Sequence, residues 1–248
     1  MSWDYNTQTV TLARVSNGNS EPLSLPNYVW EFNNKVYKLD PAQYSSLEDI
    51  DSPTKAMVIL HQYRHKNHPL LQQKHPDLQG PLLQWLEKTV GNYSNNQDNH
   101  TIITGISSVL KELAEKDGLN SDYDLAQFVL SFCQGIPYTK DSPPEQFLIG
   151  FDEYPKYPVE TLLDNAGDCE DKSILAAVLL KELGYDTAVI LYLGHVAIGV
   201  NIPNLNSDDK YYQYGNIKYY FAETTATGWK IGEIPQELET KSYLVFPI

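Results

Sequence analysis

Two kinds of periodic pattern follow each other along the C-terminal part of the chain. Between about residues 102 and 183, apart from a loop rich in proline and aromatic residues from Tyr138 to Pro158, apolar residues recur at spacings of three and four, which is the period of a helix that buries one face. From residue 187 to residue 246 they occur in short runs rich in valine, isoleucine and tyrosine, which are typical of strands. Helices and strands do not alternate, as they would in a parallel α/β sheet. The order predicts an α+β fold in which helices are followed by an antiparallel sheet.

Turn and capping residues set the expected limits of these elements. The first helix runs from about Ile102 to Gly118, because glycine readily adopts the left-handed conformation that ends a helix. A second helix is capped by Ser121 or Asp122 and stops at Gly135. Five strands are expected after the helices: Thr187 to Leu193, His195 to Ile202, Tyr211 to Tyr214, Lys218 to Glu223 and Tyr243 to Phe246.

The N-terminal part of the chain carries shorter and more varied patterns. Alternation over residues 28–38 predicts a hairpin that turns at Asn33 and Asn34, because asparagine tolerates the turn conformation. Residues 9–14 are expected to form another short strand. Two helices are also expected here, over residues 53–65 and 82–90.

A polar, turn-rich segment, residues 91–99, separates these patterns from the C-terminal helices. We expect a loop there, and with it a boundary between two parts of the chain. The division is an N-terminal extension of mixed strand and helix and unknown function, residues 1–100, followed by a C-terminal domain, residues 101–248.

Composition narrows the possible partners. The chain has 32 acidic and 18 basic residues and a formal net charge of −14. Such a surface repels nucleic acid and anionic membranes, so neither is expected as a partner. A basic or neutral peptide is attracted more easily, although surface acidity by itself commonly serves solubility. Only two cysteines occur, Cys133 and Cys169, so the sequence signals no disulfide framework.

The start of the chain shows no targeting signal. Met1-Ser-Trp-Asp-Tyr-Asn has neither a basic nor an apolar region, and no apolar run approaches the length of a membrane span. We expect a soluble protein, either cytoplasmic or an excised domain of a longer one. The compartment itself is not fixed by these features.

The most informative motif is Gly167-Asp-Cys-Glu-Asp171, which opens a third helix. Asp168 occupies the expected N-cap position, so Cys169 falls in the first turn, where unpaired N–H groups and the helix dipole favour a thiolate. The same N–H groups can receive a developing oxyanion. Cys133 lies instead in an apolar run and is expected to be a buried structural residue. The helix is expected to end at Gly184 after an apolar stripe of Leu175, Val178, Leu179 and Leu183.

Two further residues complete a possible catalytic set. His195 stands at the start of a predicted strand, beside Gly194, and Glu223 ends another predicted strand 28 residues later. If the two strands are neighbours, the carboxylate holds one imidazole nitrogen as a donor. The other nitrogen is then left to take the proton of Cys169.

The residues around these three positions resemble the transglutaminase-like superfamily, whose core is papain-like. The similarity lies in Tyr157-Pro-Val-Glu-Thr-Leu, Gly-Asp-Cys-Glu-Asp-Lys-Ser-Ile-Leu, Gly-His-Val-Ala-Ile-Gly-Val and Tyr-Phe-Ala-Glu-Thr-Thr, within about residues 120–235. Prokaryotic members, among them bacterial transglutaminase-like cysteine proteinases, are the most similar. The resemblance implies that Cys169 is the nucleophile and His195 the base. The third member of the family's triad, often Asp, falls on Glu223, which is followed by Thr225.

The resemblance also implies an aromatic or polar side chain near the oxyanion, upstream of the nucleophile. Tyr138, Tyr154 and Tyr157 are the candidates, and packing is the alternative role for each. Three histidines, His61, His65 and His68, recur at helical spacing, but without the glutamate of a His-Glu-x-x-His motif they predict no metal site. We expect neither a metal nor a cofactor.

The sequence thus predicts a cysteine-dependent acyl-transfer enzyme that attacks an amide carbonyl of a protein or peptide. Water resolves the thioester in a protease, a peptidase or another amide hydrolase, which is the preferred interpretation. An amine resolves it in a protein-glutamine transglutaminase, and a deamidase is a further alternative. The alternative from another class is a non-catalytic binding or assembly module that retains the fold.

Overall fold

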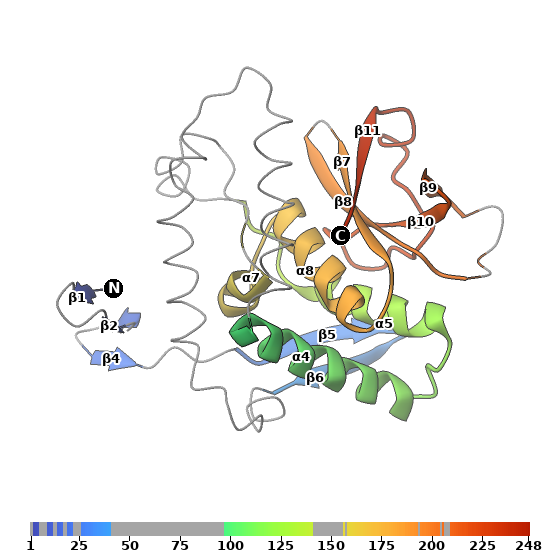
Figure 1. Cartoon of the computed structure of the whole chain (residues 1–248). Helices are drawn as coiled ribbons and strands as arrows, with labels where there is room; N and C mark the ends of the chain where they lie inside the picture. The colour runs from blue at the N-terminus through green and yellow to red at the C-terminus, as the bar shows by residue number, and fades with distance from the viewer. Residues whose placement is uncertain are drawn as a thin grey trace, which may run out of the picture.

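A computed structural model describes residues 26–40, 97–140, 158–192, 194–203 and 209–248, together with Lys156 and Leu205 (Figure 1). Four short strands near the N-terminus are also described, and they form two antiparallel pairs. These are β1 (Ser2–Asp4) with β2 (Thr9–Thr11), and β3 (Arg14–Ser16) with β4 (Asn19–Glu21). The helices expected over 53–65 and 82–90 lie outside the described residues, as do His61, His65 and His68.

The α+β prediction is confirmed, because the described helices precede an antiparallel sheet of five strands. The helices are α4 (Gln97–Lys116), α5 (Asp122–Gly135), α7 (Pro158–Asp164) and α8 (Cys169–Glu182). The sheet has the order β11-β7-β8-β10-β9. Its strands are β7 (Thr187–Tyr192), β8 (His195–Val200), β9 (Tyr211–Tyr214), β10 (Ile217–Ala222) and β11 (Tyr243–Pro247).

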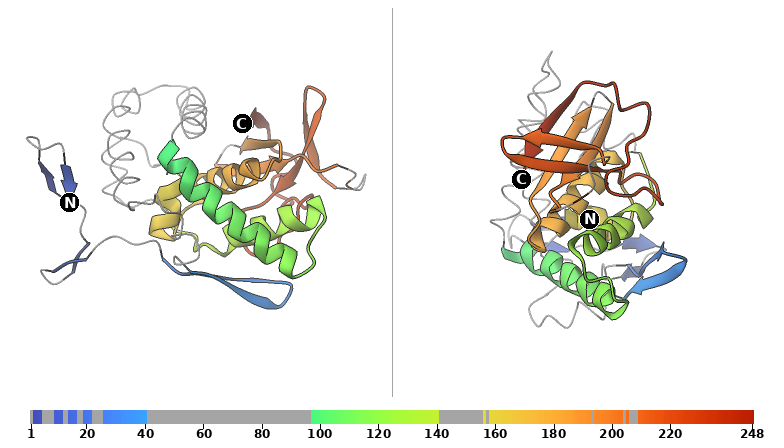
Figure 2. Two further views of the ribbon diagram at one scale, coloured as in Figure 1. Left: turned by 60° about the horizontal axis from the view of Figure 1, so that its bottom comes forward. Right: turned by 90° about the vertical axis from the view of Figure 1, so that its right-hand side faces the viewer.

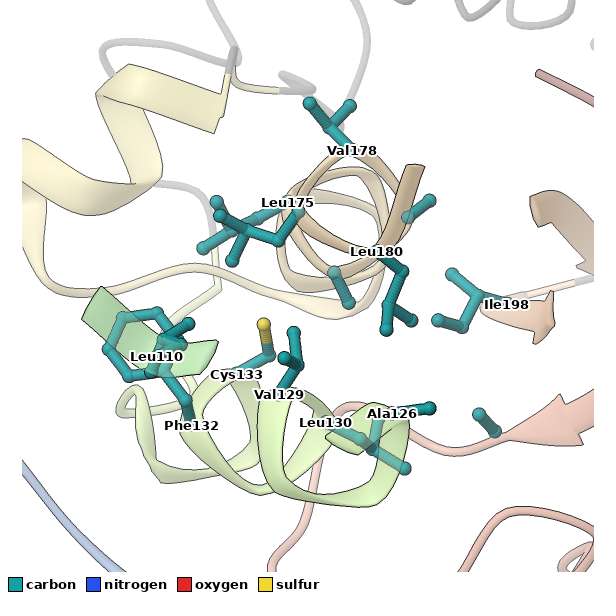
Figure 3. Close-up of a cluster of buried hydrophobic side chains, with 14 of the residues drawn as sticks. Leu110, Ala126, Val129, Leu130, Phe132, Cys133, Leu175, Val178, Leu180 and Ile198 are labelled. Atoms are coloured by element: carbon teal, nitrogen blue, oxygen red, sulfur yellow. The ribbon is translucent and has the colours of Figure 1, made fainter. Parts of the chain in front are cut away.

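Helix α8 is the centre of the fold. It contacts β7 and β8 on one side and α4, α5 and α7 on the other (Figures 1 and 2). A helix enclosed on all sides must be apolar around its circumference, and residues 174–180 are all buried and apolar. Figure 3 shows the sulfur of Cys133 pointing from α5 toward α8, between Leu175 and Leu180. The expected burial of Cys133 is therefore correct.

A hairpin of β5 (Tyr28–Phe32) and β6 (Lys35–Leu39) covers the other side of the helical layer. The predicted turn at Asn33 and Asn34 is confirmed, with φ of 49° and 60° at the two residues. Trp30 packs edge-on against Phe132 of α5, with ring centroids 5.2 Å apart. Gly135 is required by this contact, because a Cβ there would lie 2.6 Å from the Cβ of Trp30. The hairpin thus shares its core with the C-terminal helices, although the sequence placed it in the extension.

Helix limits agree with the predicted capping residues in two places. Ser121 caps α5 and accepts a hydrogen bond from the Asp124 N–H at 3.1 Å. Gly118 has a φ of 76° just after α4. The expectation for α4 was wrong at its start, because the helix begins at Gln97 inside the predicted loop. Helix α7 was missed, since the proline and tyrosines around residue 158 suggested a loop. None of the described helices is long and apolar enough to cross a membrane.

The register of the sheet decides which side chains share a face. Val189, Ile198 and Ala222 lie in the core that contains α8. A second cluster, formed largely of aromatic residues on the opposite face, contains Tyr192, Tyr212 and Phe221. Tyr192 is paired directly with His195, so the histidine begins β8 on the side of the sheet that carries this second cluster.

Candidate active site

Cys169 is the first residue of α8, as the sequence predicted. Asp168 precedes it at the N-cap, with the extended φ and ψ of −95° and −155° that a capping residue requires. The side chain of Cys169 is partly exposed, whereas Cys133 is fully buried. Of the two thiols, only Cys169 is placed where a reagent can reach it.

Buried polar contacts fix the start of α8. The Asp171 carboxylate accepts hydrogen bonds from the backbone N–H of Lys156 at 2.6 Å and of Asp168 at 3.4 Å. The ammonium of Lys156 lies 3.3 Å from the same carboxylate, so the buried charge is paired. Gly167 passes so close that a Cβ would lie 2.6 Å from the Cβ of Asp171. Gly167 and Asp171 of the motif are therefore required by the structure of this turn.

The thiol has an acidic environment. Its Sγ lies 3.1 Å from Oε2 of Glu170, close enough for the S–H to donate to the carboxylate. Burial, the charge and hydrogen bond of Glu170 and the charge of Asp168 raise the pKa of Cys169, and a hydrogen bond from the Val196 backbone N–H acts in the opposite direction. The sequence prediction of a thiolate in the first helical turn took into account the helix dipole and N–H groups, but not burial or the neighbouring carboxylates. In the structure burial, and after it the flanking acids, raise the pKa of the thiol and so favour its protonated form.

His195 and Glu223 are in direct contact, which the sequence could only propose. The Nε2 of His195 lies 2.9 Å from Oε2 of Glu223, and their side chains are 18% and 3% exposed. Strands β8 and β10 are antiparallel neighbours, which brings the two residues together across 28 positions of sequence. The glutamate therefore reaches the imidazole despite being one methylene longer than aspartate.

The other oxygen of Glu223 is also bound. Oε1 accepts hydrogen bonds from the backbone N–H of Thr225 at 2.9 Å and from its hydroxyl at 2.6 Å. Burial alone raises the pKa of Glu223, but the hydrogen bonds and charge of His195 and the two bonds from Thr225 outweigh it and lower that pKa. An ionised carboxylate only accepts, so Nε2 of His195 is the donor in this contact.

The cysteine and the histidine belong to adjoining elements. The hydrogen bond from the Val196 N–H to the sulfur places Cys169 beside the residue that follows His195 on β8. Of the tyrosines considered for the oxyanion site, Tyr138 is 47% exposed and pairs with Gly167 in a parallel bridge. It is therefore not a core packing residue, and it lies beside the turn that leads into Cys169. Tyr154 and Tyr157 are outside the described residues.

One group of side chains in the described part of the chain has the composition of a metal site. The ligand atoms of Asp168, Cys169 and Glu170 all lie within 4.8 Å of one another. Oδ1 of Asp168 is buried and has no hydrogen-bond partner among the described residues. Two carboxylates at this spacing suit a hard cation better than the thiol does. The sequence prediction did not consider these acids as ligands.

Two residues of the site were missed in the sequence. Lys172 is fully buried one turn after Cys169, and Gln134 on α5 donates to the backbone carbonyl of Glu223 at 2.8 Å. A lysine near the start of a helix whose following residues, 174–180, are all apolar was a signal for the first, because a buried charge must have a specific partner. Nothing in the local sequence indicated the second.

The fold and these contacts define an α+β domain with a cysteine at a helix start and, on the adjoining sheet, a partly exposed histidine bonded to a buried glutamate. No protein-family model matches the chain. No curated protein matches it either. Among solved structures, it is similar to Legionella pneumophila LapG in the calcium-bound form, with 19% identity and a TM-score of 0.35 over 66% of this chain and 83% of that one. The EGTA-treated form gives 20% and 0.34, over 65% and 78%.

Proposed function

We propose that this protein is a cysteine-dependent hydrolase of amide bonds, of the protease or peptidase kind, with Cys169 as nucleophile, His195 as base and Glu223 as the residue that orients the base. The observation that carries the proposal is the contact of 2.9 Å between Nε2 of His195 and Oε2 of Glu223. A partly buried imidazole with one nitrogen fixed by a buried carboxylate has its other nitrogen prepared for proton transfer. A purely structural domain has no need of that arrangement beside a cysteine at a helix start.

The proposed first half-reaction uses these three residues. Nδ1 of His195 takes the proton of the Cys169 thiol, and the sulfur attacks the carbonyl carbon of the substrate amide. The oxyanion forms near the N-terminus of α8, where backbone N–H groups can donate to it. When the C–N bond breaks, the imidazolium returns its proton to the departing amine, which leaves a thioester on Cys169 and a neutral imidazole.

Water completes the second half-reaction. His195 takes a proton from the water, whose oxygen attacks the thioester carbonyl, and the proton returns to the sulfur as the C–S bond breaks. The free enzyme and a carboxylic acid are the products. Glu223 keeps Nε2 as the donor throughout and does no bond-making.

The resting hydrogen bond of Cys169 adds a condition to this mechanism. The S–H donates to Glu170 in the free protein, and the acids on either side raise the thiol pKa. The S–H must therefore turn away from Glu170 and give its proton to Nδ1 of His195 before attack. Any change that weakens the negative field of Asp168 and Glu170 favours the reactive form.

The rival is a non-catalytic module, and the reactivity of the thiol separates the two. The proposal rests on the His195–Glu223 contact.

The test is brief treatment with iodoacetamide across a pH series, followed by mass mapping of both cysteines. We expect the label on Cys169, with a rate that falls in His195→Ala. Cys133→Ala is the matched control, because Cys133 is buried and its removal leaves the site intact. Preferential labelling of Cys133, or a Cys169 rate unaffected by His195→Ala, contradicts the proposal. Substrates are then sought by comparing a proteome treated with the intact protein and with Cys169→Ala.

A further inference from the structure

Lys172 is a buried cation whose partners are all backbone carbonyls. Its side chain is fully buried, and Nζ lies 2.7 Å from the carbonyl oxygen of Ile136, 3.2 Å from that of Gln134 and 3.4 Å from that of Thr225. Two of these carbonyls belong to the end of α5, where helical carbonyls lack intrahelical partners. The third belongs to the turn after β10. A buried ammonium with three carbonyl acceptors is satisfied and holds three segments together.

The turn that Lys172 holds is the one that carries the carboxylate. Thr225 gives its carbonyl to Lys172, while its N–H and hydroxyl both donate to Oε1 of Glu223. Oε2 of Glu223 in turn contacts His195. A continuous path of hydrogen bonds therefore leads from α8 to the imidazole.

A neighbouring contact strengthens the same junction. Ser173, the next residue of α8, contacts the hydroxyl of Thr224 at 2.9 Å and donates to the carbonyl of Val196 at 3.1 Å. Ser173 and Thr224 are both fully buried. Lys172 and Ser173, which lie three and four positions after Cys169 on α8, thus bond to Thr225 and Thr224 of the turn.

We propose that Lys172 and Thr225 are positioning residues of this site: Lys172 fixes the turn of Glu223 and Thr225 to the helix of Cys169, and Thr225 sets the orientation of Glu223. The inference rests on the proposed function. The helix of the nucleophile and the acid that orients the base come from segments 54 residues apart, so their relative position must be maintained by contacts of this kind. A shift of about 1 Å between such groups is enough to lower a rate roughly 100-fold.

Burial also lowers the pKa of Lys172 to about 8, with the charge of Glu223 acting in the opposite direction. The ammonium therefore lies within the electrostatic reach of the carboxylate that it helps to place. Lys172 touches neither the reacting sulfur nor the imidazole, so its role is to act through Thr225 and Glu223.

The test uses the whole chain and iodoacetamide as the probe, so that no substrate is needed. The rate constant for alkylation of Cys169 is measured from pH 3 to 8 for Lys172→Met, Thr225→Val, Thr225→Ser and the Lys172→Met/Thr225→Val double variant. Lys181→Met is the matched control, because it removes an exposed lysine from the same helix. Far-UV circular dichroism and thermal melting establish that each variant is folded.

We expect alkylation near neutral pH to slow by about 10- to 100-fold in Lys172→Met and Thr225→Val, as small displacements within a site do. Thr225→Ser and Lys181→Met keep the original rate. The hydrogen bond from the Thr225 hydroxyl is one of the contacts that lower the pKa of Glu223. Thr225→Val removes it, so the fall in alkylation rate on the acidic side of the pH profile (the acid limb) moves to higher pH. A residue that only stabilised the fold would not move that limb.

The double variant provides the decisive comparison. If both residues act through Glu223, the double variant loses no more than the stronger single variant. Losses that multiply overturn the inference, and so do unchanged rates in folded Thr225→Val and Lys172→Met proteins. A Cys169 that shows no His195-dependent reactivity in the unaltered protein overturns the proposed function and this inference together, whereas the other outcomes affect the inference alone.

Discussion

Cys169 and Glu170 are adjacent in sequence, and the thiol of the first lies 3.1 Å from a carboxylate oxygen of the second. The glutamate is buried at the start of α8, where its charge faces the sulfur. A helix N-terminus favours a negative charge, yet here three carboxylates, those of Asp168, Glu170 and Asp171, already lie at it. The reactivity of the thiol is therefore set by the helix on one side and by burial and the acidic residues on the other.

Glu170→Gln is expected to make Cys169 more reactive toward iodoacetamide at neutral pH. Removing the charge removes both an electrostatic cause and a hydrogen bond that raise the thiol pKa, so the fraction of thiolate at a given pH rises. Each unit by which the pKa falls gives about tenfold more thiolate. The measurement is the alkylation rate against pH, with Glu112→Gln on exposed α4 surface as the control. A rate that is unchanged or lower shows that Glu170 does not restrain the thiol.

The sequence predicted a good part of this arrangement and missed the rest for physical reasons. The start of α8 was predictable because Gly167, Asp168 and the apolar stripe are local signals. The proximity of His195 and Glu223 required the pairing of β8 with β10, a contact across the sheet that no local pattern contains. The sequence could propose it only on the condition that the two strands are neighbours, and the resemblance to a family indicated the same pair.

The raised pKa of Cys169 was not predictable from the helix alone. The direction in which the Glu170 side chain folds back toward the sulfur is a rotamer choice, and sequence spacing does not determine it. The bonds of Lys172 are similar, since its three acceptors come from α5 and from the turn after β10. Long-range contacts to backbone carbonyls leave no trace in the sequence of the residues that accept them.

Substitutions of His195 and of Glu223 are expected to lower activity by different amounts. His195→Ala removes the base, so turnover should be abolished in a folded protein. Glu223→Gln removes only the charge that orients the ring, and it should leave measurable activity. In the Ser-His-Asp triad, the corresponding change lowers kcat by roughly 10⁴-fold. The measurement is kcat/KM on a substrate identified with Cys169→Ala as the inactive reference. Unchanged turnover in His195→Ala removes the mechanism.

Glu223 is expected to make stability depend on pH on the acidic side. Its pKa is lowered in the folded state, so the folded protein binds the proton less readily than the unfolded chain. The resulting stabilisation is fully present above the unfolded pKa of about 4.3 and is lost as pH falls through the lower folded value. Urea denaturation from pH 7 down to pH 3 should show a loss that is smaller in Glu223→Gln. Equal losses in the two proteins would show that other carboxylates account for the acid limb.

The last prediction concerns the group that resolves the thioester. Water is present at about 55 M in any exposed site, so an amine at millimolar concentration wins only where the protein binds it and limits the access of water. Near the sulfur, Asp168 and Glu170 are acidic and attract an ammonium, but a protonated amine is not a nucleophile. An amine donor would have to lose its proton beside two carboxylates that favour the charged form. We therefore expect hydrolysis to dominate. The measurement supplies a reactive peptide or glutamine substrate with excess primary amine and quantifies acid and amide products, with Cys169→Ala as the blank. A product dominated by the amine adduct at millimolar amine would make this protein a transferase.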